Sequence, residues 1–375
     1  MTHRDRVLTA IQRREPDRVP LDLGSVGGWM VDGVYHDLLR LLALDDSVQP
    51  YRSGSSANYY DERILERFDI DFRHLWFSSP DRPNRRRLAD GTVLDEWGIL
   101  WSPTGSYPDV FPLRDADLSD VEKHPWPFPQ PGWNLEALNL RARHLYKQTD
   151  YAIVGKGVLD GAGIFERCCY LRTYERFLTD LCVEERLAQA LIDRVTEVEL
   201  ALWDLYLQAV GPYLHIVQRA SDFGSQQSLL MSPELYRRFI KPADKKVFDF
   251  IKRRAPQARL WFHSCGAVRP LIEDFLDYGV EILNPVQPLA KGMASAGLKQ
   301  DFGARLCFHG GIDLQKAMVG TREDVREEVI ARVGALGAGG GYILAPANHL
   351  QEDTPAENVA ELYLFAREYG TYPLP

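Results

Sequence analysis

Short, continuous hydrophobic runs alternate along the chain with longer segments whose hydrophobic residues recur at the spacing of an amphipathic helix. Continuous rather than alternating runs are typical of strands that are buried on both faces of a parallel sheet. About eight strand–helix units favour a single (β/α)8 barrel domain over residues 1–375. An open, doubly wound α/β sheet is the alternative. The segments that we interpret as strands lie at 19–23, 152–155, 214–217, 258–262, 280–283, 306–309 and 342–345, and 69–76 is a possible further strand.

The pattern changes between residues 80 and 133. Asp90-Gly91 is a hairpin signal, and Thr92–Trp101 alternates like an exposed strand. Pro108–Trp133 contains many prolines and has no clear period. We therefore predict that a hairpin and a long loop are inserted in the N-terminal half of the barrel, where they either cover a binding site or elaborate the surface.

The composition narrows the class of protein. A content of 45% hydrophobic and 26% charged residues is ordinary for a soluble globular protein. The net charge of −9 argues against a nucleic-acid partner, because phosphate binding needs a basic face. No apolar run is long enough to span a bilayer, and the first residues lack the apolar segment of a signal peptide. The five cysteines are too few and too scattered for a disulfide framework, so we predict a reduced, cytoplasmic protein.

Polar side chains follow five successive predicted strands. In a barrel the carboxyl ends of the strands face one side, where ligands bind. Each residue alone has a simpler explanation, such as a turn or a helix cap, but five strand ends in succession favour one shared polar site. No dinucleotide or phosphate-loop motif follows any of the strands, which argues against a nucleotide. The residues are Gln218 and Asp222, His263 and Cys265, Asn284 and Gln287, His309 and Asp313, and Asn348 and His349.

The pair of His263 and Cys265 is the strongest chemical signal among them. It stands where a hydrophobic run meets Gly266, and both side chains can ligate a metal or transfer a proton. Two ligands do not close a metal site, so a buried histidine beside an inert cysteine is the alternative interpretation.

Five segments resemble the uroporphyrinogen decarboxylase superfamily. They are Arg4–Pro20 (RDRVLTAIQRREPDRVP), Trp261–Pro270 (WFHSCGAVRP), Ile282–Gln287 (ILNPVQ), His309–Gln315 (HGGIDLQ) and Gly340–Asn358 (GGYILAPANHLQEDTPAEN). The resemblance covers nearly the whole chain, and the four C-terminal blocks in this order are specific. It implies a (β/α)8 barrel with its site at the carboxyl ends of the strands.

The superfamily holds two chemistries. Uroporphyrinogen decarboxylases bind a polyanionic tetrapyrrole and carry an Arg-Gln-Ala-Gly-Arg-Tyr segment after the first strand, whose arginines pair with substrate carboxylates. The corresponding residues here, Gly24–Met30, include no arginine. Because a guanidinium is the natural partner of a carboxylate, this argues against the decarboxylase.

The other branch comprises corrinoid-dependent methyltransferases, some of which bind zinc through a His-x-Cys pair and a later cysteine. His263 and Cys265 match the pair, whereas the later cysteine would fall at Asn348-His349. His349 or Asp222 would then be the third ligand. A site with fewer thiolates suits the activation of a methylated ether or amine, or protonation of its leaving group, better than the activation of a thiol.

We therefore predict a methyltransferase that moves a methyl group between a small methylated substrate, of methoxy or methylamine type, and the cobalt of a corrinoid (cobalamin). The corrinoid is free or bound to a partner protein, zinc is the candidate metal, and a homodimer is the candidate assembly. The alternatives are a decarboxylase acting on a tetrapyrrole carboxylate and a non-catalytic corrinoid or tetrapyrrole binder. The predicted catalytic residues are His263, Asp222, Asn348 and His349, and the predicted substrate- or cofactor-binding residues are Gln218, Asn284, Gln287, His309, Asp313 and Trp29, the last expected to be exposed on a loop.

Overall fold

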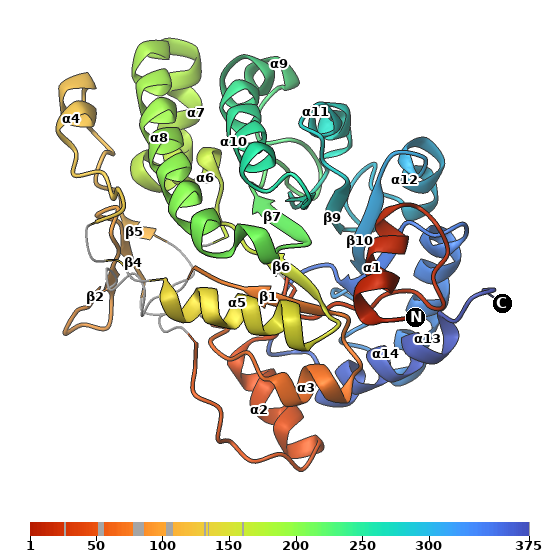
Figure 1. Ribbon diagram of the computed structural model, residues 1–375. Coiled ribbons are helices and arrows are strands. Elements are labelled where there is room, and N and C mark those ends of the chain that lie inside the picture. The colour runs from red at the N-terminus through yellow and green to blue at the C-terminus, as the bar shows by residue number, and fades with distance from the viewer. Residues whose placement is uncertain are drawn as a thin grey trace.

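Strands from most of the length of the chain pair in one parallel sheet (Figure 1). The computed structural model describes residues 1–25, 28–51, 56–77, 86–102, 108–130, 133, 135–159 and 161–374. Within these residues the sheet has seven strands in the order β1-β6-β7-β8-β9-β10-β11, and every neighbouring pair is parallel. Their bounds are β1 Phe72–Leu75, β6 Ala152–Gly155, β7 Ile216–Ala220, β8 Arg259–His263, β9 Ile282–Val286, β10 Cys307–Ile312 and β11 Tyr342–Pro346.

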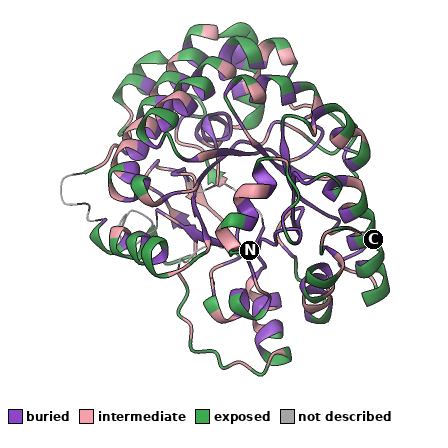
Figure 2. Cartoon of the chain, turned by 45° about the vertical axis from the view of Figure 1, so that its right-hand side comes forward, coloured by how far each residue is buried: buried purple, intermediate pink, exposed green. Residues whose placement is uncertain are grey.

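The sheet is curled, with helices around its outer side (Figure 2). Apart from Arg259, every residue of these seven strands is buried, as expected from continuous hydrophobic runs. The α/β class and the parallel sheet that the sequence predicts are therefore confirmed.

Helices follow most of the strands. Among those in the described ranges, none combines the length and the apolar character needed to cross a bilayer. The α-helices of the main fold are α1 His3–Ile11, α2 Asp32–Leu41, α3 Glu62–Arg67, α5 Glu136–Gln148, α6 Ile164–Arg172, α7 Tyr174–Val183, α8 Glu185–Val210, α9 Pro233–Leu235, α10 Lys241–Arg254, α11 Ile272–Asp277, α12 Ser295–Phe302, α13 Arg322–Arg332 and α14 Ala356–Tyr369. Shorter 3₁₀ or π turns are η1 Gly211–Tyr213, η2 Tyr236–Ile240, η3 Arg269–Leu271 and η4 Val333–Gly337.

A small apolar cluster fills the inside of the sheet at the amino-terminal end of the strands. Alternate residues of neighbouring strands contribute to it, among them Trp261, Ile282 and Cys307. Helix α1 adds Val7 and Ile11 to the same cluster. This helix therefore closes the amino-terminal end, and the carboxyl ends of the strands remain for polar side chains.

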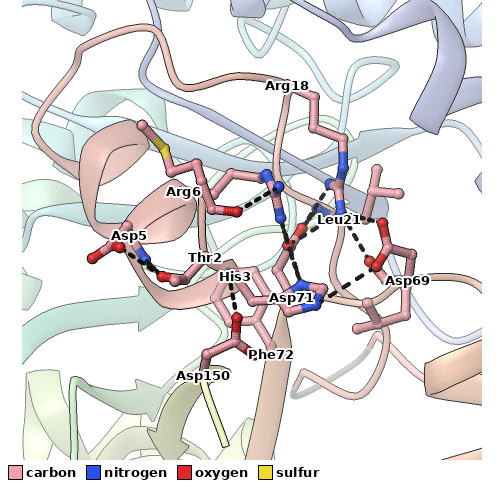
Figure 3. A network of polar contacts seen from close by, with 12 residues as sticks. Thr2, His3, Asp5, Arg6, Arg18, Leu21, Asp69, Asp71, Phe72 and Asp150 are labelled. Carbon is pink, nitrogen blue, oxygen red and sulfur yellow. Dashed lines mark hydrogen bonds and ion pairs between the residues drawn. The ribbon is translucent and has the colours of Figure 1, made fainter.

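Asp71, just before β1, anchors α1 at that end (Figure 3). Its fully buried carboxylate accepts hydrogen bonds from Arg6, Arg18 and the backbone N–H of Leu21, and it lies 2.8 Å from Nδ1 of His3. Burial opposes the charge, but the hydrogen bond from His3 and the charges of Arg18 and Arg6 hold the pKa of Asp71 below its usual value. The network ties the helix and the segment after it to the sheet.

The segment predicted as a first strand, 19–23, pairs only through an isolated bridge. Leu21 bridges Leu344 of β11 in parallel, and its carbonyl accepts the N–H of Asp71 at 3.0 Å. The segment therefore lies between β11 and β1, the two edge strands. In the described residues it extends the curled sheet without forming an eighth ladder strand.

Four short strands, β2 to β5, form a separate antiparallel sheet in the order β2-β3-β4-β5. Asp90 and Gly91 lie in the turn between its first two strands. Arg172 of α6 donates to the carbonyls of Leu113 and Ala116, which ties the following segment to the main fold. Of the predicted insertion, 80–85, 103–107 and 131–132 lie outside the described residues. The elements of this region are β2 Arg86–Arg87, β3 Val93–Leu94, β4 Leu100–Trp101, β5 Pro108–Val110 and α4 Leu118–Lys123.

Candidate active site at the carboxyl ends of the strands

His263 is the last residue of β8 and points toward the inside of the curled sheet. It has the same strand parity as Trp261, which belongs to the inner apolar cluster. Its ladder neighbours are Ala220 of β7 and Asn284 of β9. Only 5% of its surface is exposed, so its ring nitrogens depend on protein groups for hydrogen bonds.

Three donor atoms of different kinds meet beside this histidine. A carboxylate oxygen of Asp222, a ring nitrogen of His263 and Sγ of Cys265 all lie within 4.8 Å of one another. Nε2 of His263 is 3.4 Å from Sγ of Cys265 and 3.5 Å from Oδ1 of Asp222. Imidazole nitrogen, thiolate sulfur and carboxylate oxygen are the ligand types that zinc accepts. We call these three residues the donor cluster; it fits a divalent metal with three protein ligands and an open position.

The loop after β8 turns on a glycine and brings Cys265 back toward Asp222. Gly266 has a φ of 84°, and a Cβ there would lie 2.4 Å from the backbone of Gly224. The N–H of Cys265 donates to Oδ1 of Asp222 at 2.8 Å, which holds the carboxylate beside the thiol. The N–H of Gly266 donates to Oε1 of Gln287 at 2.9 Å. Gln287, which the sequence suggests as a ligand-binding residue, therefore anchors this loop.

Glu166 places a second carboxyl group behind Asp222. Its Oε2 accepts the backbone N–H groups of Gly163 and Asp222. Burial, and then the charge of Asp222, raise the pKa of Glu166 to about 8. The raised pKa favours the protonated form of Glu166, which limits the negative charge of the site. Burial, with Asp222 and Glu166 nearby, also raises the pKa of the Cys265 thiol well above its usual value.

Asn348 and His349 approach the donor cluster from the loop after β11. Nδ2 of Asn348 is 3.6 Å from Sγ of Cys265. The ring of His349 is used differently, because its Nδ1 accepts the backbone N–H of Trp29 at 3.3 Å. Of the two residues considered as a third ligand, Asp222 is the one within the cluster.

Trp29 is buried, so the prediction of an exposed loop residue was wrong. Its indole packs against Tyr60 with the ring centroids 5.3 Å apart, and the next residue, Met30, makes a parallel bridge to Leu350. The loop therefore folds back along the segment after β11 instead of projecting into solvent. Nε1 of Trp29 is buried and has no hydrogen-bond partner among the described residues, which exclude 26–27 of this loop.

Asn284, His309 and Gln218, also expected at the site, lie buried on β9, β10 and β7. Oδ1 of Asn284 is 2.5 Å from Nδ1 of His263, and its Nδ2 is 2.7 Å from Nδ1 of His309. Asn284 therefore connects His263 with the interior of the sheet.

Asp313 closes the turn after β10. Its carboxylate accepts the backbone N–H groups of Gln315 and Lys316, both at 3.0 Å, and its own N–H donates to Glu328. These contacts direct Asp313 to its own loop rather than to the donor cluster, as in the simpler explanation of an aspartate that forms a turn.

Three buried ionisable residues next to this site were not predicted: Glu166, Asp22 and His74. Asp22 interrupts the hydrophobic run at 19–23, and an ionisable residue in such a run is a signal that could have identified it; His74 lies among Asp69, Asp71 and Arg73, so the same signal does not single it out. Glu166 is the third residue of α6, and its side chain accepts the N–H of the N-cap residue Gly163. A glutamate at this position is a common helix cap, so the sequence offers no sign of a further role.

The fold of this chain is found in a solved structure that has little sequence identity to it. The chain resembles a methyltransferase from Methanosarcina mazei with a TM-score of 0.63 and 18% identity, over 98% of this chain and 99% of that one. An endo-1,4-beta-xylanase from Caldicellulosiruptor owensensis has a TM-score of 0.35 at 10% identity, covering 66% and 86%. The GH53 catalytic domain of Ignisphaera aggregans has a TM-score of 0.37 at 10% identity, covering 92% and 99%. No curated protein matches the sequence. The sequence model of the uroporphyrinogen decarboxylase (URO-D) family matches residues 105–369, well over half of the chain, and the chain therefore belongs to this family.

Proposed function

We propose that this protein is a methyltransferase that transfers a methyl group from a small methylated substrate to a corrinoid. The observation that carries the proposal is the donor cluster of Asp222, His263 and Cys265 at the carboxyl end of the sheet. The similarity to the Methanosarcina mazei methyltransferase extends over nearly the full length of both chains and supports the same class of reaction.

Zinc is the metal that this donor set suits best. His263 would ligate through Nε2, Cys265 through Sγ and Asp222 through a carboxylate oxygen. Bound there, zinc supplies a Lewis acid for the oxygen or nitrogen atom that carries the methyl group. A ligand set with one thiolate leaves more positive charge on the metal than one with two, which suits an ether or an amine substrate better than a thiol.

The surrounding residues hold the donor cluster in place. The amide of Asn348 faces Sγ of Cys265 and can donate to a thiolate there. The N–H of Cys265 orients the carboxylate of Asp222, and Oε2 of Glu166 accepts the backbone N–H of Asp222. The substrate therefore meets ligands that are already oriented, which lowers the cost of aligning the methyl carbon with its acceptor.

Trp29 is the substrate contact that we favour from the predicted set. Its buried indole N–H has no partner in the described part of the chain, and its backbone contacts His349, next to Asn348. It can donate a hydrogen bond to a heteroatom of the substrate. The corrinoid, free or carried by a partner protein, supplies cobalt(I) as the methyl acceptor.

Metal analysis and a methyl-transfer assay test the proposal together. We expect about one zinc per chain and methylation of cob(I)alamin from a methoxylated or methylamine compound. His263→Ala and Cys265→Ser should each reduce both signals. A protein that methylates cob(I)alamin from none of these compounds, with or without added zinc, would overturn the proposal.

Decarboxylation of a tetrapyrrole is the second candidate, because the family match itself favours it. The segment Gly24–Met30 contains no arginine to pair with substrate carboxylates. Formation of coproporphyrinogen from uroporphyrinogen in an anaerobic assay would establish this candidate. Binding of a corrinoid or tetrapyrrole without turnover would instead indicate a non-catalytic binder.

A further inference from the structure

A chain of buried polar side chains runs from His263 across the inside of the sheet. Nδ1 of His263 contacts Oδ1 of Asn284, and Nδ2 of Asn284 is 2.7 Å from Nδ1 of His309. Nε2 of His309 is 2.9 Å from Oδ2 of Asp22, whose Oδ1 is 2.9 Å from Nε2 of His74. Every member is at most 5% exposed, so protein atoms, and not bulk water, decide where each proton lies.

Asp22 determines the proton positions at the inner end of this chain. An ionised carboxylate only accepts hydrogen bonds, so Nε2 of His74 and Nε2 of His309 must both carry protons. Burial favours the neutral carboxyl, but the contacts with His74 and His309 hold the pKa of Asp22 well below its usual value. Burial also lowers the pKa of both histidines. Each ring then carries one proton, and within the described residues Nδ1 of His74 indeed has no hydrogen-bond partner.

The remaining proton positions follow in sequence. Since His309 has its single proton on Nε2, its Nδ1 must accept a hydrogen bond from the amide group of Asn284. Oδ1 of Asn284 then faces His263, so Nδ1 of His263 must be the donor. In the tautomer with a single ring proton, Nε2 of His263 is therefore the nitrogen that has none, and Nε2 is the atom that faces Cys265 and Asp222.

We propose that Asp22 is a positioning residue that fixes the tautomer of His263 through His309 and Asn284, so that an unprotonated Nε2 faces the donor cluster. A histidine must present a nitrogen lone pair to a metal, and the partner of its other nitrogen sets which nitrogen is free. The consequence for metal binding rests on the proposed function. The tautomer itself does not, because it is a property of the metal-free protein.

The first test is the tautomer of His263 in the metal-free protein, measured by ¹⁵N NMR of the histidine rings. We expect a proton on Nδ1 of His263 and on Nε2 of both His74 and His309. Nε2–H on His263 in the wild-type protein would overturn the proposal, whatever the protein does with zinc. If the protein shows the expected tautomers but binds no zinc, the role of Asp22 stands and only the proposed metal site is contradicted.

The second test compares two substitutions of Asp22. Asp22→Ala removes the acceptor for His309, so His263 should populate both tautomers. Zinc should then bind roughly 10- to 100-fold more weakly, as it does when a ligating histidine loses the hydrogen-bond partners that orient it. Asp22→Asn should give one tautomer of His263 instead of a mixture, because its amide still pairs with both histidines. If its carbonyl accepts from His309, the tautomers of His309 and His263 stay as in the wild type; if its NH2 group donates to His309, both tautomers reverse together.

Asp244→Ala is the matched control, because Asp244 is equally buried but pairs with Arg219, which keeps Glu199 as a partner. It should lower stability without changing the His263 ring signals or zinc affinity. An Asp22→Ala protein with wild-type His263 signals would overturn the proposal, as would an Asp22→Asn protein in which the proton of only one of His309 and His263 changes nitrogen. If Asp22→Ala does not fold, the wild-type and Asp22→Asn spectra still decide.

Discussion

Replacing His263 with alanine should remove bound zinc and methyl transfer, and it should also weaken the fold. A strand-end histidine is expected from the sequence to contribute little to the core, but this one is 5% exposed and hydrogen-bonded to Asn284. Its loss leaves Oδ1 of Asn284 buried without a donor, which costs about 1–3 kcal/mol. Removing the packed ring brings the total to about 3–5 kcal/mol, a large part of the 5–15 kcal/mol typical of natural proteins.

His263→Gln separates the two effects. A glutamine amide can still donate to Asn284 and fills part of the volume, so we expect a smaller loss of stability than for alanine, but it offers the metal no imidazole. Zinc affinity should fall in both variants by more than the roughly 10- to 100-fold that loss of an outer hydrogen-bond partner causes.

Three measurements check this reasoning: zinc content after dialysis, zinc affinity by competition with a chelator, and the free energy of unfolding in urea. Stoichiometric zinc with near wild-type affinity in both variants would place the metal elsewhere. A metal-free wild-type protein that still transfers methyl groups would leave His263 as an acid or hydrogen-bond donor toward the leaving group.

Three further predictions concern stability and substrate. Burial, aided by the charge of Arg4, lowers the pKa of His215 from 6.5 to about 4, so its neutral form stabilises the fold above pH 6.5 and this contribution is lost as the pH falls through 4. His215→Asn should flatten the pH dependence of unfolding in urea over that range, and an unchanged slope would contradict the assignment. Arg219→Met leaves the buried carboxylates of Glu199 and Asp244 without their cationic partner and should lower the free energy of unfolding by about 3–5 kcal/mol in the same assay. A loss below about 1 kcal/mol would show that protonation or another group compensates for the missing guanidinium. The purified protein should form little or no coproporphyrinogen from uroporphyrinogen, because Gly24–Met30 lacks arginine, and robust product formation would refute this reasoning.

The strands of the main sheet were predictable because burial on both faces demands continuous hydrophobic sequence. The runs at 152–155 and 258–262 fall within one residue of β6 and β8. The run at 19–23 contains Pro20 and Asp22 and, within the described residues, forms only a bridge; Pro20 has no backbone N–H to donate to a ladder. Helix α4 went unrecognised in a proline-rich stretch, although Asp117 and Asp120 form a capping box at its start.

The polar strand ends could also be identified from sequence, but not their partners. His263 and Cys265 were found because they are close in the chain and follow a strand. Whether Asp222 or His349 approaches them depends on how two loops fold over the sheet, and the structure places Asp222 in the donor cluster.

By itself, the sequence determined the order of the strands of the parallel sheet and of most of its helices, the family resemblance and most of the polar residues that follow the strands, because these depend on local spacing. Only the tertiary structure decided which of these residues meet. Asp22 contacts His309 across 287 residues of chain, and Glu166 contacts Asp222 across 56. Hydrogen bonds and metal coordination act over distances of about 2–4 Å, so they are set by the curvature of the sheet and the course of its loops, which no periodicity in the sequence encodes.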